Sequence, residues 1–385
     1  MKHLVLTEEN SELRSDLFTS VKRVVIKVGS AVLADENGIN RRVVANLARE
    51  IAFLHNSGRE VILITSGAVA AGKRKLCCQV DNRLTIPEKQ AFAAVGQSSL
   101  MHDYDEAFAE NDKNIAQVLL THSDLANRKR YLNVRNTILT LFSLGVIPIV
   151  NENDTVSTEE LKFSDNDNLA ALVTNLIEAD MFISLTDVDA LYDKNPLVHG
   201  DARKINTVTK VTDTLVGMVD NSKSALGTGG MRSKIIAAQM VSAGGACSFI
   251  GSGRQKNVLR HLFAGKMVGT FFCPQQEKMQ GRKRWIAYVL KPRGSLLLDR
   301  GACAAISERG KSLLPSGIVE VKGEFGRGES VQCVNEKGSV VAVGLTNYCS
   351  DDLEKIKGQR SSKIERIIGY KDYDEVLHRD NMVLM

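Results

Sequence analysis

Residues 21–30 read VKRVVIKVGS, a β-branched apolar run that closes on a lysine, a glycine and a serine. Similar runs recur as far as residue 253, and longer segments with apolar residues at helical spacing separate them. Strands that alternate with helices are typical of βαβ units. We therefore expect an α/β fold with an open, mainly parallel sheet sandwiched by helices. Further strands are expected at residues 60–67, 114–121, 146–153, 180–187 and 247–252.

One of the intervening helices is marked by Val44, Leu47, Ile51 and Leu54, which recur at helical spacing. Gly58 follows as the expected stop, since glycine tolerates the left-handed conformation that ends many helices. This helix is expected to pack its apolar stripe on the sheet.

The composition predicts a soluble, cytoplasmic protein of two domains. A chain of 385 residues is long for one core, and its 43% hydrophobic and 25% charged shares are ordinary. No apolar stretch approaches the roughly 18 residues that a membrane helix needs, and residues 1–16 lack the pattern of an export or organelle signal. The seven cysteines show no C-x-x-C pair, so we expect free thiols, no structural metal and no membrane contact.

The pattern of the sequence changes after Pro274, where a charged connector leads to short apolar runs that are interrupted by glycines. Such runs indicate strands without long helices between them. The expected division is an N-terminal extension at 1–20, an α/β domain at 21–275, a connector at 276–291, a small β-rich domain at 292–370 and a tail at 371–385.

The carboxyl ends of the expected strands are the places to look for ligands. Helix N-termini and unpaired backbone N–H groups converge there in open α/β sheets. Lys27 stands beside Gly29 and Ser30, so that backbone amides and an ammonium would together bind phosphate oxygens. A lysine that reaches out to the sheet edge is the alternative explanation.

A second cation comes from the loop Gly227–Lys234, where three glycines and a hydroxyl precede the lysine. That composition suits a loop that wraps phosphates. Asp154, Asp165 and Asp167 supply carboxylates that would hold Mg²⁺ or orient the lysines, and helix capping is the alternative for some of them.

Residues 67–73 form a misleading motif. They match G-x-x-x-x-G-K, but Arg74 follows where a P-loop needs Ser or Thr for magnesium. We therefore reject a P-loop and expect Ser66 and Gly67 to form a helix N-terminus that holds a substrate anion.

The motifs occur in a fixed order: IKVGS, ITSGAVAAG, AVGQ, IVNENDTV, DNDNL, LTDVDALY and GTGGMRSK. As a set, over roughly residues 20–275, they resemble the amino-acid kinase family. NENDTV followed by SDNDNLAALV is similar to the branch that acts on L-glutamate, and differs from the branches for aspartate, acetylglutamate, carbamate and UMP. The resemblance implies ATP-dependent phosphorylation of the glutamate side-chain carboxylate to L-glutamyl 5-phosphate, the first step of proline biosynthesis.

The resemblance also implies roles for the residues that match. Lys27 and Lys234 would neutralise the transferred phosphoryl group, and Asp167 would organise both lysines and Mg²⁺. The implied glutamate ligands are Ser66, Asp154 and Asn166. The implied nucleotide site comprises Lys27, Thr186, Asp187, Thr228, Gly229, Gly230, Met231, Arg232, Ser233 and Lys234. Direct metal ligands are not assigned.

The implied ligands and partners are ATP, Mg²⁺ and L-glutamate, with proline as feedback inhibitor. A homo-oligomer and functional coupling to a glutamyl phosphate reductase are also expected. The C-terminal residues from about 292 to 369 resemble a PUA domain, a small β-rich fold that binds RNA in other proteins. We favour a structural or regulatory role for it, since Trp285 is the only tryptophan and no stacking surface is evident.

Two alternatives stay open at the level of sequence. A kinase of the same fold would act on another amino acid or a nucleotide. An RNA-binding protein would act through the PUA-like domain and keep only a decayed kinase domain, although the intact lysines and Asp167 argue against decay.

Overall fold

The computed structural model describes residues 18–35, 38–78, 84–157, 166–194, 196, 198–212, 215–217, 230–275 and 281–385. The chain separates into two compact units, Met1–Lys278 and Met279–Met385. Each unit has a sheet and a core of its own.

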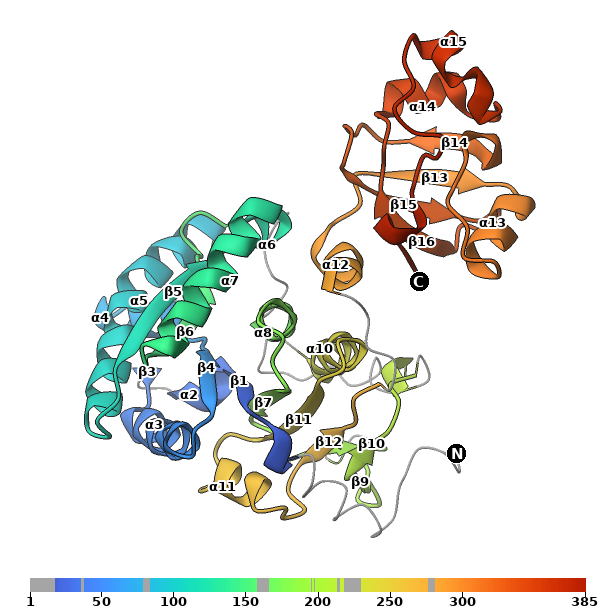
Figure 1. The fold of residues 1–385 in the computed structure, drawn as a ribbon. Helices are drawn as coiled ribbons and strands as arrows, with labels where there is room; N and C mark the ends of the chain where they lie inside the picture. Colours follow the sequence, from blue (N-terminus) through green and yellow to red (C-terminus); the bar gives the residue numbers. More distant parts are fainter. Residues whose placement is uncertain are drawn as a thin grey trace. The chain divides into compact units, whose positions relative to one another are not determined.

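The first unit is built on an eight-stranded sheet in the order β10-β12-β11-β7-β1-β4-β6-β5 (Figure 1). The pairs from β11 through β5 are parallel, and β12 runs antiparallel to β11. The predicted mainly parallel sheet is confirmed. Its strands are β1 (Arg23–Val28), β4 (Glu60–Ile64), β5 (Ile115–Leu120), β6 (Ile147–Glu152), β7 (Met181–Thr186), β10 (Thr207–Val208), β11 (Cys247–Ser252) and β12 (Thr270–Phe272).

Helices cover both faces of this sheet (Figure 1). On one face the buried side chains of Val24, Ile26 and Val28 pack with residues of three helices, α3, α5 and α11. On the other face α8 contacts β1 and β7, and α10 contacts α8 and β11. Fully burying one such aliphatic side chain stabilises the fold by about 1.5–3 kcal/mol. The helices are α3 (Arg41–Asn56), α5 (Ile86–Ala109), α8 (Asn166–Leu176), α10 (Met231–Ala243) and α11 (Val258–Phe263).

Local sequence signals explain where several helices begin and end. Asn40 accepts hydrogen bonds from the backbone N–H groups of the first turn of α3, and Gly58 lies just beyond its end at φ 84°. Thr85 and Glu88 form a capping box at the start of α5. The predicted apolar stripe of α3 is buried as expected.

The sequence did not predict strands β10 and β12. They contain two and three residues, too few to show a periodic pattern, and they pair only because the rest of the chain places them at the sheet edge.

The second unit contains a five-stranded sheet in the order β14-β13-β15-β16-β17. Its core includes Leu296, Val331 and Tyr348, and Trp285 is buried in the same unit. The strands are β13 (Gly294–Leu298), β14 (Ile318–Lys322), β15 (Ser330–Val334), β16 (Val340–Leu345) and β17 (Met382–Leu384), accompanied by the short helices α12 (Gly281–Arg284), α13 (Arg300–Ser307), α14 (Ser350–Ile356) and α15 (Ile364–Ile368). The predicted β-rich C-terminal domain is confirmed.

Candidate active site

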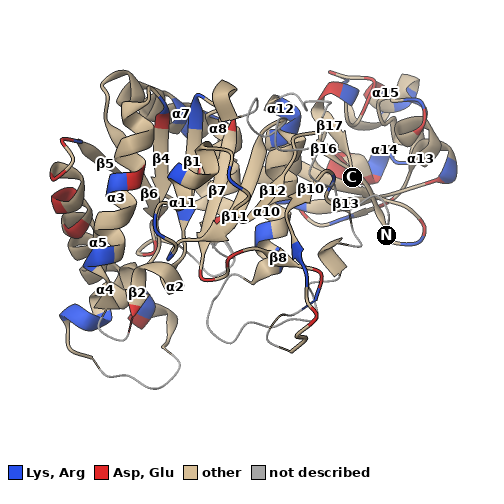
Figure 2. Cartoon of the chain, turned by 90° about the horizontal axis from the view of Figure 1, so that it is seen from below, with Lys and Arg blue, Asp and Glu red and all other residues tan. Residues whose placement is uncertain are grey.

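Charged residues are rare in the large sheet and are therefore informative. Its strands carry only Arg23, Lys27, Glu60 and Glu152 as charged residues, and most of the strand surface in Figure 2 has neither colour. Lys27 and Glu152 are buried, and both lie close to the carboxyl ends of their strands. Since burying an ammonium without a partner is costly, Lys27 must have a counter-charge nearby.

That counter-charge is Asp167, in the first turn of α8. Lys27 Nζ lies 2.9 Å from Asp167 Oδ1, and Lys234 Nζ lies 2.9 Å from Asp167 Oδ2. Asp167 has no exposed surface, while Lys27 and Lys234 are 5% and 6% exposed. Ser184 Oγ donates a further hydrogen bond of 3.0 Å to Asp167 Oδ1. One carboxylate therefore holds two ammonium groups that come from the strand β1 and the helix α10.

The protonation state of this buried trio follows from its charges. Burial alone would raise the pKa of the Asp167 carboxyl, but the two ammonium groups outweigh burial and hold that pKa below its ordinary value. The trio therefore has two positive charges and one negative charge. Two ammonium groups held at one buried place suit an anionic ligand such as a phosphate group.

Backbone groups around the lysines favour the same kind of ligand. Gly29 precedes the short helix α2 (Ser30–Leu33), and its N–H already donates to the carbonyl oxygen of Leu185 at 3.1 Å, so that this N–H is not available to an anion as the sequence suggested. Gly230 precedes α10, so Lys234 sits in the first turn of a helix whose N-terminus carries partial positive charge. Met231, Arg232 and Ser233 occupy the same turn. Thr228 and Gly229, which belong to the nucleotide site that the resemblance implies, lie outside the described residues.

Thr186 and Asp187 stand at the carboxyl end of β7, beside β1. Thr186 is buried and its hydroxyl donates to Asp187 Oδ1 at 2.9 Å, whereas Asp187 is exposed. The Gly253 N–H donates a hydrogen bond of 2.8 Å to the Thr186 carbonyl oxygen. The pair lies at the same edge of the sheet as the lysines.

The structure also brings together two of the three expected glutamate ligands. Asn166 Nδ2 donates to Ser66 Oγ at 2.9 Å and to the backbone carbonyl of Thr65. Asn166 is the neighbour of Asp167 at the start of α8, so this polar cluster adjoins the lysine trio. Gly67 follows Ser66 at φ 103°, a conformation that favours glycine, and it precedes helix α4 (Ala68–Lys75), so the predicted helix N-terminus is present. Asp154 is half-buried just after β6.

Three polar residues of this region were missed as site residues by sequence reasoning. Ser184 supports Asp167 from within a strand. Asn151 Oδ1 accepts from Asn166 Nδ2 at 3.1 Å, and Gln97 Oε1 accepts from Asn151 Nδ2 at 2.8 Å. Asn151 was visible as a polar residue at a strand end and Gln97 as part of the AVGQ motif, but only the fold shows that they touch.

Comparison with known proteins identifies the family of the first unit. A model of the amino acid kinase family matches residues 22–250. The chain belongs to the amino acid kinase family. A model of the PUA domain matches residues 294–368, which confirms the second predicted resemblance.

Relatives of this amino acid kinase match along nearly its whole length. Glutamate 5-kinase of Desulfotalea psychrophila is 56% identical, over 97% of this chain and 100% of the relative. Those of Syntrophotalea carbinolica and Geobacter sulfurreducens are each 48% identical, again over 97% of this chain and 100% of the relative.

The P-loop-like motif of this amino acid kinase has a packing role. A Cβ atom on Gly72 would lie 1.8 Å from the Phe92 carbonyl oxygen of α5, and one on Gly96 of α5 would lie 1.8 Å from the Ala68 carbonyl oxygen of α4. The two helices therefore touch backbone to backbone. Lys73, the motif's lysine, lies in the last turn of α4, away from its N-terminus. The rejection of a P-loop agrees with this geometry.

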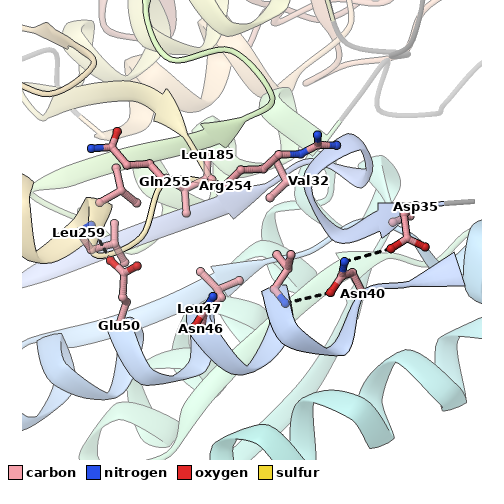
Figure 3. Close-up of a pocket in the computed structure, with 14 residues that line it drawn as sticks. Val32, Asp35, Asn40, Asn46, Leu47, Glu50, Leu185, Arg254, Gln255 and Leu259 are labelled. Atoms are coloured by element: carbon pink, nitrogen blue, oxygen red, sulfur yellow. Dashed lines mark hydrogen bonds between the residues drawn. The ribbon is translucent and has the colours of Figure 1, made fainter. Parts of the chain in front are cut away.

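A separate cavity of about 310 Å³ lies against α3 and the start of α11 (Figure 3). All three charged residues that line it already have partners. Glu50 accepts a backbone N–H of α11 at 2.6 Å, Arg254 donates to a carbonyl of α2 at 2.8 Å, and Asp35 accepts from Asn40 at 3.0 Å. Burial raises the pKa of Glu50. These groups tie elements together, so the trio remains the better candidate for chemistry.

A metal site formed by protein groups alone is absent from the part of the chain that the structure describes, where no three His, Cys, Asp or Glu side chains cluster. Asp167 is already engaged by both lysines. Asp165, one of the carboxylates considered for Mg²⁺, lies outside the described residues. Within those same residues, no helix is long and apolar enough to cross a membrane.

Proposed function

We propose that this amino acid kinase transfers the γ-phosphoryl group of ATP to the side-chain carboxylate of L-glutamate, forming L-glutamyl 5-phosphate, the first step of proline biosynthesis. The observation that carries the proposal is the buried trio, in which one carboxylate aligns two ammonium groups at the ligand-binding edge of the sheet. The substrate follows from the relatives named glutamate 5-kinase.

The chemistry requires charge neutralisation more than proton transfer. A glutamate carboxylate with an ordinary pKa of about 4.3 is ionised at neutral pH, so it needs no general base. One of its oxygens attacks the γ-phosphorus in line while the bond to the ADP bridging oxygen breaks and its electron pair leaves with ADP. Lys27 and Lys234 would neutralise the equatorial oxygens, where negative charge is spread in the transition state.

Asp167 would position these lysines instead of contacting the phosphates. Its two oxygens each hold one ammonium group, which fixes the distance between the cations before ATP arrives. Such preorganisation avoids reorganising charged groups during the reaction.

The remaining assignments follow from position. Ser66, Asp154 and Asn166 would bind glutamate on the β4 and β6 side of β1. On the β7 and α10 side, the proposed nucleotide contacts in the described residues are Thr186, Asp187, Gly230, Met231, Arg232 and Ser233, in addition to both lysines. The γ-phosphate and the acceptor carboxylate then meet at β1.

The described residues do not form a cage for Mg²⁺, and we assign no protein ligand to it. Mg²⁺ commonly binds through substrate phosphates, water and only one or two carboxylates. When bound with ATP, it would add positive charge at the phosphates.

The direct test traps the labile product. Purified protein, MgATP and L-glutamate are incubated with hydroxylamine, and γ-glutamyl hydroxamate and ADP are measured. We expect both products with glutamate and neither with aspartate. Activity with aspartate but not glutamate would refute the substrate assignment.

Proline should inhibit competitively with glutamate, because both carry an α-carboxylate and an amino group that suit the same polar cluster. The measurement is the apparent KM for glutamate at increasing proline. An unchanged KM would contradict a shared site. Homo-oligomer formation and coupling to a glutamyl phosphate reductase stay predictions.

RNA binding by the second unit is a separate candidate function, favoured by a cavity of about 700 Å³. Its lining includes Arg309, Lys311, His378 and Arg379, which suit an anionic ligand. Filter binding at graded salt tests it, since phosphate contacts give a steep salt dependence.

A further inference from the structure

The hydrogen bonds of the polar cluster beside the trio run in a defined donor-to-acceptor direction, which follows from the acceptor at one end of the cluster. The backbone carbonyl of Thr65 can only accept, so the Asn166 atom that faces it must be the amide nitrogen. Asn151 then has to present its oxygen to Asn166, which leaves its nitrogen to donate at the other side. Gln97 receives that donation on Oε1 at 2.8 Å.

This chain of amides also determines what the site offers a substrate. Asn166 uses its nitrogen on protein acceptors, so its oxygen is the atom left to accept from a ligand. Asn166 Nδ2 has two hydrogens for three acceptors, Ser66 Oγ among them, and Ser66 keeps its own hydroxyl hydrogen to donate. An acceptor for an ammonium group and a donor for a carboxylate are the pair that an α-amino acid requires.

Gln97 closes this chain at the far end. If its amide were turned over, two nitrogen donors would face each other at Asn151. In the observed orientation, Gln97 Nε2 is buried with no acceptor among the described residues. A buried donor without an acceptor costs about 1–3 kcal/mol of folding free energy. Gln97 keeps this amide orientation in spite of that cost, because the other orientation would place two donors against each other.

Gln97 is also held firmly in place. The neighbouring Gly96 lets α5 approach the backbone of α4. Two helical turns further along α5, Tyr104 OH forms a hydrogen bond of 2.8 Å with Thr65 Oγ1. Thr65 is also the residue whose backbone carbonyl starts the amide chain. Helix α5 is thus connected to both ends of the polar cluster.

We infer that Gln97 is a positioning residue for the glutamate site, which fixes the amide orientation of Asn151 and thereby the acceptor that Asn166 presents. The inference rests on the proposed function for the identity of the ligand. Gln97 acts through Asn151 and has no role in phosphoryl transfer.

Two substitutions separate this role from simple packing. Gln97→Met keeps the length of the side chain but removes the acceptor, so Asn151 loses its partner. We expect the KM for glutamate to rise roughly 10-fold or more, the effect of one buried amide left unpaired. The kcat and the KM for ATP should stay near those of the wild type. Gln97→Glu retains an oxygen for Asn151 and should keep the KM for glutamate near that of the wild type.

Ser98→Met is the matched control, because Ser98 is exposed on the same helix. It should leave all three constants unchanged. The inference is overturned if Gln97→Met binds glutamate normally, or if Gln97→Glu is as impaired as Gln97→Met while both remain folded by circular dichroism. If the wild type makes no hydroxamate from glutamate, it is the proposed function that fails.

Discussion

The two units of this protein differ in the ion pairs that they bury. In the first, Asp167 and its two lysines are almost completely buried. In the second, the ion pairs Arg300–Glu336 and Arg327–Asp372 have side chains that are about half exposed or more. Exposed pairs contribute roughly 0–1 kcal/mol, because water and salt screen them.

The difference shows where to look for function. Burying charges costs several kcal/mol per ion, and hydrophobic residues would fill the same space at no loss of stability. A buried trio with two ammonium groups at the carboxyl edge of the sheet therefore suits an anionic ligand, whereas exposed pairs suit solubility.

Asp167→Asn should have the largest effect, because it leaves two buried ammonium groups without their carboxylate. We expect kcat to fall on the order of 10³-fold and unfolding to become easier by about 3–5 kcal/mol. Urea unfolding and hydroxamate formation measure the two effects. Asp372→Asn, which removes an exposed carboxylate from its pair with Arg327, is the control and should change stability by less than about 1 kcal/mol.

The same substitution should change the response to acid. Because the folded pKa of Asp167 lies below its unfolded value of about 3.9, its stabilisation is fully present above that value and is lost as pH falls through the folded pKa. Wild-type stability should thus approach that of Asp167→Asn below about pH 4. A stability difference that stays constant from pH 7 to pH 3 would contradict the role of this carboxylate.

Lys27→Met and Lys234→Met should each lower kcat by roughly 10²-fold or more, the effect of removing one electrostatic contact to the transition state. Folding should survive, since Asp167 keeps one of its two ammonium partners in each variant. Steady-state kinetics together with circular dichroism provide the measurement. Normal turnover by either folded variant would show that the phosphates bind elsewhere.

Gly96→Ala should have a smaller effect that is mainly structural. Its new methyl group would meet the Ala68 carbonyl at 1.8 Å, so α4 and α5 must separate, at a cost of about 1–3 kcal/mol. Because Gln97 adjoins Gly96, the KM for glutamate should rise while the KM for ATP does not. Gly200→Ala adds the same group in open space and serves as the control for thermal unfolding. Equal melting temperatures for the two variants would contradict the close helix packing.

The sequence predicted the site best where the functional residues lie within short, recognisable motifs. Lys27, Asp167 and Lys234 each lie in a short motif, and apolar runs mark the strands that carry or adjoin them. The physical reason is that buried strands need continuous β-branched residues, so a lysine within one is conspicuous. The predicted sheet and the three charged residues could therefore be found without coordinates.

Contacts between distant amides could not be found in this way. Gln97 and Asn151 are 54 residues apart, and nothing in either neighbourhood specifies which atom of each amide faces the other. Ser184 resembles any polar residue of a strand until Asp167 is placed beside it. Hydrogen-bond polarity depends on tertiary packing, and only the fold supplies that packing.

Removal of the second unit should have the smallest effect on catalysis. Every residue proposed to act in phosphoryl transfer lies between Lys27 and Lys234, and the core of residues 279–385 is formed by its own side chains, including Leu296 and Tyr348. A fragment that ends at Lys278 should therefore fold and form hydroxamate with a kcat close to that of the full chain. Regulation by proline is where a change is expected, because coupling between distant sites commonly involves free energies of only about 1–3 kcal/mol. A soluble, folded fragment with no activity would show that the exposed charges of the second unit belong to a contact that completes the site, and the contrast between the units would then be wrong.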